Sequence, residues 1–200
     1  MNRRLSEPPD DEQLFATSAF DAVSVFGRRA PLEVEIGSGK ARFLIESARA
    51  NPSHDFLGLE RSLSYYRLCR VRLSRAALPN ARILRADASL FVPALAPRSV
   101  RAFHVSFPDP WPKKKQRKRR LLDGVFLELL ADALEEGGLL RIQTDHPDYG
   151  ATLGPLLDSV RTLERAEWES APALPPTHYE IKYRAEGRPI WRFLLRRRED

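Results

Sequence analysis

The stretch LEVEIGSGK at residues 32–40 decides the fold class of this sequence. Its first five residues alternate apolar and acidic side chains, which predicts a strand, and the GSG that follows is typical of a tight turn. A helix is expected next, because apolar residues recur on one helical face until Asn51-Pro52. These apolar residues are Ala41, Leu44, Ile45 and Ala48. A strand, a glycine turn and a helix form the first unit of an α/β sheet.

The same alternation of strands and helices continues along the chain. Helices are expected through residues 66–76, 126–133 and 153–160, with Gly137-Gly138 ending the second one. The segment 171–183, with three prolines, is interpreted as a loop. Further strands are expected at residues 55–59, 81–85, 100–107, 139–143, 166–169 and 190–195. This order predicts an α/β fold with a doubly wound, mostly parallel, seven-stranded, Rossmann-like sheet.

Length and composition favour one globular domain. The 200 residues suit a domain at residues 31–200, preceded by a polar, partly disordered leader at residues 1–30. Apolar residues of the leader are expected to pack on the domain: Leu14, Phe15, Phe20, Val23, Val25 and Phe26. No apolar run approaches the roughly 18 residues that span a bilayer, so no membrane partner and a cytoplasmic location are expected. Cys69 is the only cysteine and the four histidines lack metal-ligand spacing, so no metal is expected.

Positive charge is concentrated in one segment. The chain has 33 basic and 27 acidic residues, a net charge of +6, and residues 113–120 alone contain seven basic residues in eight positions. The basicity is therefore local, and a segment of this kind typically attracts polyphosphates or anionic surfaces.

The glycine turn separates three classes of nucleotide ligand. A P-loop requires G-x-x-x-x-G-K-[ST], but Val34 and Ala41 stand at its first and last positions. A dinucleotide fingerprint requires a small residue where this chain has Arg42. The remaining ligand class contains ribose and adenine without phosphates.

Three acidic residues at expected strand ends fit such a ligand. Glu60 follows Gly39 by 21 residues, the spacing at which a carboxylate accepts hydrogen bonds from ribose hydroxyls. Asp87 is placed to accept from an adenine amino group, and Glu35 to meet a cationic end. S-adenosylmethionine combines these parts. The alternative interpretation is a bare turn of Gly37 and Gly39 with solvated acidic residues.

The segment FPDPWP at residues 107–112 follows the expected fourth strand. Prolines on both sides fix the direction of the Asp109 carboxylate, and Trp111 offers a face on which an unpaired RNA base can stack. The segment differs from the Asp/Asn/Ser-Pro-Pro-aromatic pattern of enzymes that methylate exocyclic amines, which indicates another acceptor atom. The adjoining basic residues are expected to contact RNA phosphates, a flexible solvated loop being the alternative.

Several of these segments together resemble the bacterial tRNA (guanine-N7-)-methyltransferase family. The resemblance covers about residues 32–195, and one departure is Ala41, where the family often has a third glycine. The segments are residues 34–40 (VEIGSGK), 56–60 (FLGLE), 87–88 (DA), 107–114 (FPDPWPKK), 118–120 (KRR), 144–145 (TD) and 177–183 (THYEIKY).

The resemblance implies a class I S-adenosylmethionine-dependent enzyme that methylates N7 of a guanosine in tRNA, at position 46 of the variable loop. It implies that Glu35, Gly37, Gly39, Glu60, Asp87 and Asp109 bind the cofactor, with Asp109 also catalytic. It implies guanosine contacts for Lys113, Asp145, Thr177, His178, Tyr179 and Glu180. It implies tRNA contacts for Lys115, Gln116, Arg117, Lys118, Arg119 and Arg120.

Guanine N7 already carries a lone pair, so the expected mechanism needs no general base and rests on alignment and charge stabilisation. Glu180 is expected to accept from the guanine N1–H and N2–H₂ edge, or to pair with Lys182 or Arg184. Asp145 is expected to balance charge, or Thr144-Asp145 to cap the next helix. A different methyltransferase and a non-catalytic RNA-binding module remain as alternatives. Both a monomer and a homodimer are compatible with the sequence.

Overall fold

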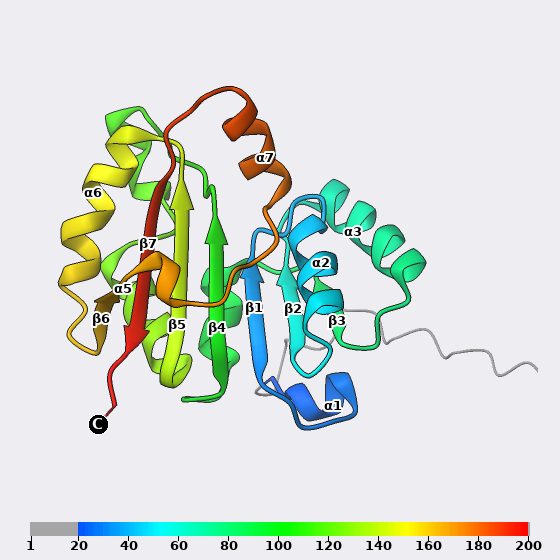
Figure 1. Ribbon diagram of the computed structural model, residues 1–200. Helices are drawn as coiled ribbons and strands as arrows, with labels where there is room; N and C mark the ends of the chain where they lie inside the picture. The colour runs from blue at the N-terminus through cyan, green and yellow to red at the C-terminus, as the bar shows by residue number, and fades with distance from the viewer. Residues whose placement is uncertain (1–19, 200) are drawn as a thin grey trace, which may run out of the picture.

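A computed structural model describes residues 20–199, and its centre is a seven-stranded sheet (Figure 1). The strand order is β3-β2-β1-β4-β5-β7-β6. Strands β1 to β5 pair in parallel, and β7 is antiparallel to both of its neighbours. The strands are β1 (Leu32–Ile36), β2 (Asp55–Leu59), β3 (Ala81–Leu84), β4 (Val100–Ser106), β5 (Leu134–Thr144), β6 (Leu163–Ala166) and β7 (Trp191–Arg197).

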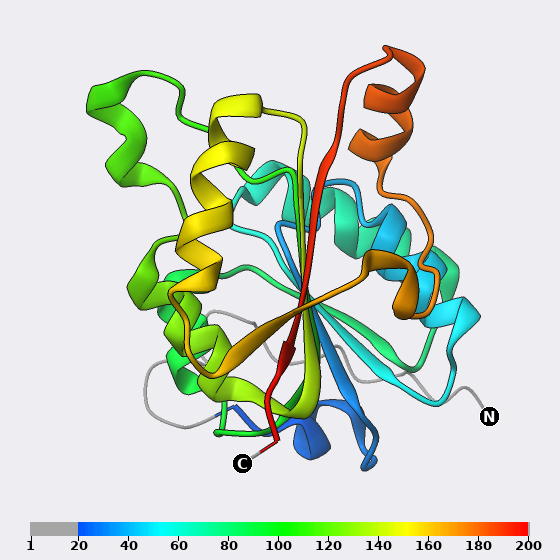
Figure 2. The same ribbon diagram turned by 60° about the vertical axis from the view of Figure 1, so that its left-hand side comes forward.

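Helices cover both faces of the sheet, as the edge-on view in Figure 2 shows. The α-helices are α1 (Ala22–Phe26), α2 (Arg42–Ala50), α3 (Leu63–Ala76), α4 (Ala88–Phe91), α5 (Gly124–Ala133), α6 (Pro147–Asp158) and α7 (His178–Ala185). Short 3₁₀ helices are η1 (Val92–Ala94), η2 (Lys114–Arg119) and η3 (Trp168–Ser170). The prediction of a doubly wound, mostly parallel seven-stranded sheet is confirmed.

The core consists of two apolar clusters, one on each face. The smaller cluster joins α2 and α3 to β2 and β3 through residues such as Leu44, Phe56 and Cys69. The larger cluster joins α4, α5 and α6 to the other face and includes Phe103, Leu130 and Tyr149. Both faces are buried, so the central strands consist of near-continuous buried residues.

The prediction that Gly137-Gly138 ends a helix is wrong. Helix α5 ends at Ala133, and β5 runs from Leu134 through both glycines to Thr144. The glycines instead allow an irregularity, because the β4–β5 register shifts between Val100 and Ala102 and Gly137 has a φ of 68°. A Cβ on Gly138 would lie 2.7 Å from the carbonyl oxygen of Glu135.

Two predictions near the C-terminus are also wrong. The strand expected at 166–169 lies earlier, at Leu163–Ala166, and Trp168–Ser170 forms η3. The expected loop at 171–183 contains α7, which begins where Thr177 caps the helix after the last proline. Segment 167–177 crosses the β4, β5 and β7 face that α2 and α3 leave uncovered (Figure 1).

The start of the described region packs on the domain. Phe20 bridges to Leu95, and Phe20, Val25 and Phe26 contact the larger core cluster, whereas Val23 is exposed. The expected disorder of the leader, and the packing of Leu14 and Phe15, lie outside the described residues. Among residues 20–199, no helix is both long and apolar enough to cross a membrane.

Candidate active site

The glycine turn between β1 and α2 is held by its neighbours. The backbone N–H groups of Gly37 and Ser38 donate to the Leu59 carbonyl oxygen. Gly37 and Gly39 have φ angles of 83° and 53°, in the left-handed region that glycine adopts without steric cost. Ala41, which starts α2, has a φ of 56° and is fully buried. This explains physically why a glycine suits that position.

Glu60 and Cys69 fix the Gly39 peptide from two sides. Glu60 follows β2, and its carboxylate accepts from the Gly39 N–H at 2.9 Å and from the Ser62 N–H at 2.7 Å. The Cys69 thiol donates to the Gly39 carbonyl oxygen at 3.3 Å, and burial raises its pKa to about 12. Cys69 is thus a neutral packing residue of the turn. Sequence reasoning gave it no such role, because α3 approaches the turn only in the folded sheet.

Two buried carboxylates on the same face of β1 have opposite environments. The Glu33 carboxylate accepts hydrogen bonds from His54 Nδ1 and His104 Nε2, both at 2.7 Å. Burial favours a higher pKa for Glu33, but the hydrogen bonds and charges of the histidines outweigh it and lower the pKa to about 2. The interpretation of His54 and His104 as ordinary residues missed this pairing, since no sequence spacing links them to Glu33.

Glu35 is the carboxylate left without such partners. Burial raises the pKa of Glu35 to about 8, and the negative charge of Glu60 adds to this shift. Glu35 Oε2 is buried without a hydrogen-bond partner among residues 20–199. A buried polar atom without a partner costs about 1–3 kcal/mol, so a cationic ligand at this position would stabilise the carboxylate. The Glu35 carboxylate therefore fits the ammonium or sulfonium end of S-adenosylmethionine.

Asp87 follows β3 and caps α4. Its Oδ1 accepts from the Ser89 N–H at 3.0 Å and from the Ser89 hydroxyl at 2.8 Å. Its Oδ2 lies 3.6 Å from Arg61, and a third of the side chain is exposed. This capping orients the Asp87 carboxylate at the carboxyl ends of the parallel strands, where Glu35 and Glu60 also lie.

The segment after β4 has an unusual backbone. Phe107 and Trp111 have φ angles of 55° and 40°, which bulky residues rarely adopt and which cluster at functional sites. Asp109 between them is exposed, and no residue in 20–199 donates a hydrogen bond to its carboxylate. The hydrogen bond that the Tyr179 hydroxyl donates to Tyr65, burial, and the negative charges of Tyr65, Tyr183 and Asp109 raise the pKa of Tyr179 to about 12. The Asp109 carboxylate therefore lies within electrostatic range of Tyr179 on α7.

Helix α7 lies over the glycine turn and carries the expected guanosine contacts. Thr177 Oγ1 accepts from the Glu180 N–H at 3.0 Å, which fixes the start of the helix. The buried Glu180 carboxylate accepts from Arg184 and from Arg192, and one of its oxygens lies 3.5 Å from Gln143 Nε2. The pairing with Arg184 that the sequence left open is present.

Aromatic rings connect α7 to the segment after β4. The Tyr183 ring lies 5.2 Å from the Phe107 ring and 5.7 Å from the Tyr179 ring, between ring centroids. The Tyr179 ring in turn is 6.2 Å from that of His178. Offset and edge-to-face pairs of this kind fix one element against another.

A small cavity joins the two parts of the site. Residues of the glycine turn and of α7 line it together, and its volume of about 20 Å³ is enough for one water. The cavity is too small for an adenosyl group, so a ligand that occupied it would displace α7 or its flanking segment. The lining residues are Glu35, Gly37, Ser38, Gly39, Lys40, Arg42, Phe43, Ser106, Thr177, His178 and Tyr179.

Asp145, Lys113, Asp87 and Asp109 do not line this cavity. Asp145 follows β5 and forms an ion pair with Arg188 at 2.9 Å, so it faces the end of α7. It does not cap the next helix, because His146 caps α6. Lys40, which sequence reasoning assigned no role, lies 3.2 Å from His178 Nε2. Its position directly after Gly39 was the available signal.

The basic segment 113–120 packs on α6. Residues 114–119 form η2 and are largely exposed. Arg117 pairs with Asp148 at 2.9 Å, and the Arg119 guanidinium lies 5.0 Å from the Trp111 ring centroid. The Trp111 face expected to stack an RNA base therefore has an arginine over it.

Arg120 differs from the rest of the basic segment. Its side chain is 8% exposed, donates to Asp148, Thr152 and the Pro110 carbonyl oxygen, and lies over the Tyr149 ring. These contacts anchor the segment to α6, and the tRNA contact expected for Arg120 from the sequence stays a prediction. Among the described residues, no group of histidine, cysteine, aspartate or glutamate side chains is arranged to hold a metal ion.

Comparison with known proteins agrees with this geometry. A family model described as "Putative methyltransferase" matches residues 29–193. A tRNA (guanine-N(7)-)-methyltransferase of Myxococcus xanthus is 35% identical over 198 residues, which cover 96% of each chain. A protein of the same name from Methylococcus capsulatus is 35% identical over 186 residues, covering 90% of this chain and 80% of that one.

A solved structure is similar in fold. The aminoglycoside resistance methyltransferase NpmB1 matches with a TM-score of 0.61 at 18% identity, over 87% of this chain and 90% of that one. The strand order with an antiparallel β7 is that of the class I S-adenosylmethionine-dependent methyltransferases. The chain therefore belongs to the methyltransferase family whose relatives include these tRNA (guanine-N(7)-)-methyltransferases.

Proposed function

We propose that this chain transfers the methyl group of S-adenosylmethionine to N7 of a guanosine in tRNA. The observation that supports the proposal is the position of Thr177, His178 and Tyr179 directly over the glycine turn, so that one cavity has walls from both segments. The full-length similarity to tRNA (guanine-N(7)-)-methyltransferases supports the same substrate. The target at position 46 of the variable loop, and action in the cytoplasm as a monomer or homodimer, are parts of this proposal.

The cofactor would lie across the carboxyl ends of β1, β2 and β3. Glu35 would meet its cationic end, Glu60 its ribose hydroxyls and Asp87 its adenine amino group. The backbone of Gly37 and Gly39 would allow close approach, because no side chain projects there. When bound, S-adenosylmethionine supplies a methyl group on a positively charged sulfur.

Guanine N7 would attack this methyl carbon with its own lone pair. The new N–C bond forms as the C–S bond breaks, the sulfur keeps the bonding electrons, and the positive charge passes to the purine ring. No proton must be removed first, so the residues of this chain contribute orientation and negative charge. Asp109 would lie beside the reacting atoms, and Asp145 would stabilise the charge on the purine.

Glu180 would select guanine over adenine. Its carboxylate is fixed by Arg184 and Arg192 and carries lone pairs that accept from the N1–H and N2–H₂ groups of guanine. Adenine presents no donor at N1, so a buried carboxylate facing adenine would lose this pairing. Lys113, Thr177, His178 and Tyr179 would complete the guanosine site.

The test is incubation of the chain with unmodified tRNA and cofactor labelled in the methyl group, followed by nucleoside analysis. We expect the label in 7-methylguanosine. Label in another nucleoside would indicate a different RNA methyltransferase and reject the proposal. If calorimetry detects no S-adenosylmethionine binding, the chain is a non-catalytic RNA-binding module.

A further inference from the structure

Helix α3 carries an unusual concentration of unneutralised positive charge. Its 14 residues include four arginines and no acidic residue. These residues, Arg67, Arg70, Arg72 and Arg75, are all exposed, and we call them the α3 arginine surface. None of the four lies within ion-pair distance of an acidic side chain of residues 20–199.

Exposed arginines on other elements are mostly paired. Arg98 and Arg101 pair with glutamates that follow each other in β5, and Arg165 pairs with Asp158. Arg117 in the basic segment pairs with Asp148. Unpaired exposed arginines also occur singly elsewhere, as at Arg29, Arg161 and Arg196, but α3 gathers four of them on one helix without an acidic residue.

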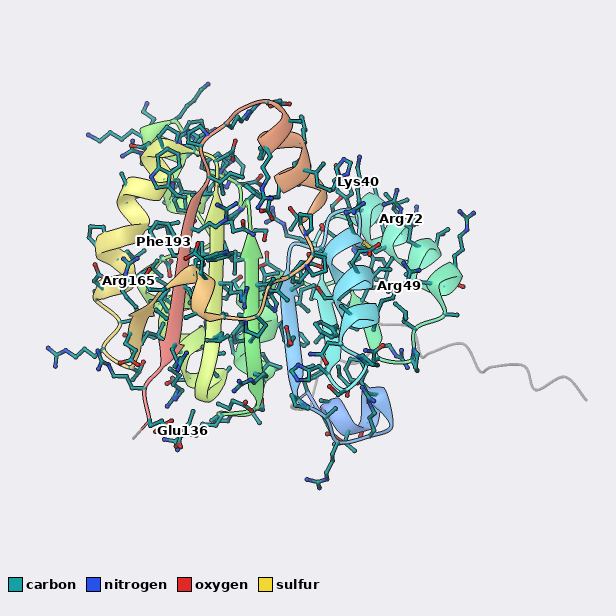
Figure 3. The ribbon with its side chains drawn as sticks, viewed as in Figure 1. Lys40, Arg49, Arg72, Glu136, Arg165 and Phe193 are labelled. Carbon is teal, nitrogen blue, oxygen red and sulfur yellow. The ribbon has the colours of Figure 1, made fainter. Side chains whose placement is uncertain are left out.

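Positive charge continues from α3 to the candidate active site. Arg72 donates to the Lys40 carbonyl oxygen at 2.8 Å, and Lys40 contacts His178 on α7. After burial, the charges of Lys40, Arg72, Arg42 and Lys182 are the causes that lower the pKa of His178. Figure 3 shows Lys40 and Arg72 near one another at the outer edge of the molecule.

The α3 arginine surface and the basic segment flank the site from opposite sides. Helix α3 packs on β3, at one edge of the sheet, whereas the basic segment packs on α6, which contacts β6 at the other edge. Six strand spacings of about 4.8 Å separate these edges by about 29 Å. Helix α7 lies between α3 and α6 (Figure 1), and the cavity that it lines with the glycine turn lies at the carboxyl end of β1.

We propose that the α3 arginine surface is a second tRNA-contact surface, so that the bound tRNA spans the site from the basic segment to α3. This inference rests on the proposed function for the identity of the RNA. Arg67 and Arg75 are separated by about 12 Å along the helix axis, which suits a stretch of backbone phosphates. Arginine binds phosphate in a bidentate manner, and neutralisation releases the counterions of the RNA.

The apolar side of α3 does not favour a lipid surface. Tyr66 and Cys69 are buried against the smaller core cluster, and the exposed arc offers only Val71 and Leu63 as large apolar side chains. A helix that binds in a membrane interface presents a wide apolar face to the lipid. A polyanion in water, held by charge alone, is the occupant that this surface fits.

The test compares two variants, each with three arginines replaced. The first is Arg67→Gln/Arg70→Gln/Arg75→Gln, which keeps Arg72 because that residue supports the Lys40 backbone. Glutamine preserves helix propensity and removes the charge. The control is Arg29→Gln/Arg161→Gln/Arg196→Gln, three exposed arginines near the opposite end of the strands, for which no ion pair with a described acidic residue is found.

Methylation of full-length tRNA is measured over a range of salt concentrations. For the α3 variant we expect KM for tRNA to rise about tenfold, kcat to stay within about twofold, and the slope of log KM against log salt to fall by about 2 to 3. The control should match the wild type in all three. Calorimetry with S-adenosylmethionine should give equal affinity for all three proteins, which shows that the α3 variant is folded.

Two results would overturn the inference, and a third would contradict the proposed function alone. If the α3 variant has the same KM and salt slope as the control, the α3 arginine surface does not contact tRNA. This result would leave the proposed function intact. Loss of binding to vesicles of anionic phospholipid, with tRNA binding unchanged, assigns the surface to a membrane. A wild-type protein that binds tRNA and leaves it unmethylated contradicts the proposed function, and the tRNA affinities of the two variants then still decide the role of α3.

Discussion

The glycine turn and α7 form two walls of one site, but they are built differently. Backbone hydrogen bonds and buried side chains fix the turn: Leu59 accepts two N–H groups, and Glu60 and Cys69 clamp Gly39. Apart from the buried Glu180 carboxylate, ring contacts and ion pairs near the surface hold α7. A wall with buried contacts stays rigid, while one with exposed contacts opens at lower free energy. The turn thus provides a preformed cofactor site, and α7 can move to admit ligands.

Replacement of Asp109 is expected to have the largest effect on activity. Asp109→Ala should reduce kcat by at least about 100-fold, because the variant lacks a carboxylate beside the reacting atoms. The side chain is exposed, so the free energy of unfolding should change by less than about 0.5 kcal/mol. Steady-state methylation and urea unfolding measure the two effects. Wild-type rates would exclude Asp109 from the site.

Replacement of Glu35, which lies beside the glycine turn, should change how the stability of the protein depends on pH. The folded pKa of about 8 lies above the ordinary glutamate value of 4.5, so the carboxyl contributes stability that is fully present below pH 4.5 and is lost as pH rises towards 8. Glu35→Gln stays neutral and should be more stable than the wild type at pH 9 by an amount on the order of several kcal/mol. Urea unfolding of the cofactor-free proteins from pH 4 to 9 measures this difference.

The same variant should bind S-adenosylmethionine more weakly, because glutamine provides no negative charge for the cation. Calorimetry at pH 8 provides the affinity. A stability difference that does not depend on pH would show that Glu35 titrates normally. Unchanged affinity would show that Glu35 does not face the cationic end.

Replacement of Arg120 tests the anchor of the basic segment. Arg120→Ala should lower the free energy of unfolding by about 1–2 kcal/mol, because the variant loses the packing of the guanidinium over the Tyr149 ring and its hydrogen bond to the Pro110 carbonyl oxygen. The matched change Lys115→Ala/Arg117→Ala should leave stability nearly unchanged and flatten the salt dependence of tRNA binding. Equal stability of Arg120→Ala and the wild type would contradict an anchoring role.

Replacement of Ala41 should have the smallest effect. Ala41→Gly removes a Cβ from a residue in the left-handed region, where an L-residue costs roughly 1–2 kcal/mol. The glycine gains entropy in the unfolded chain, so the net stabilisation should be at most about 1 kcal/mol. Thermal unfolding detects this change. A loss of more than about 1 kcal/mol would mean that the buried methyl group matters more than the backbone strain.

The local sequence pattern was sufficient to predict the glycine turn and the strand before it. Alternation in residues 32–36 and the two glycines identify β1 and the turn, and the residue spacing identifies Glu60. The pairing of Glu33 with His104 was not predictable, because residues 71 positions apart meet only through the β1–β4 register. For the same reason, the sequence did not show that Glu35 lacks the histidine partners that Glu33 has.

The second wall was harder to predict from the sequence. The prolines before Thr177 concealed the start of α7, whose eight residues are too few for a clear apolar period. Arg120 looked like its neighbours in a basic run, and only the folded position of α6 brings Asp148 to it. The positive φ angles of Phe107 and Trp111 likewise depend on tertiary contacts.

The central claim is that the glycine turn and α7 enclose the cofactor together. It is tested most directly by a crystal structure with S-adenosylhomocysteine, the demethylated product of the cofactor. The account predicts this ligand above Gly37 and Gly39, with its amino group at Glu35, its ribose at Glu60 and α7 displaced from its present contact with Lys40. A ligand bound at any other surface, or one bound over the turn with α7 in its present place, would contradict the account.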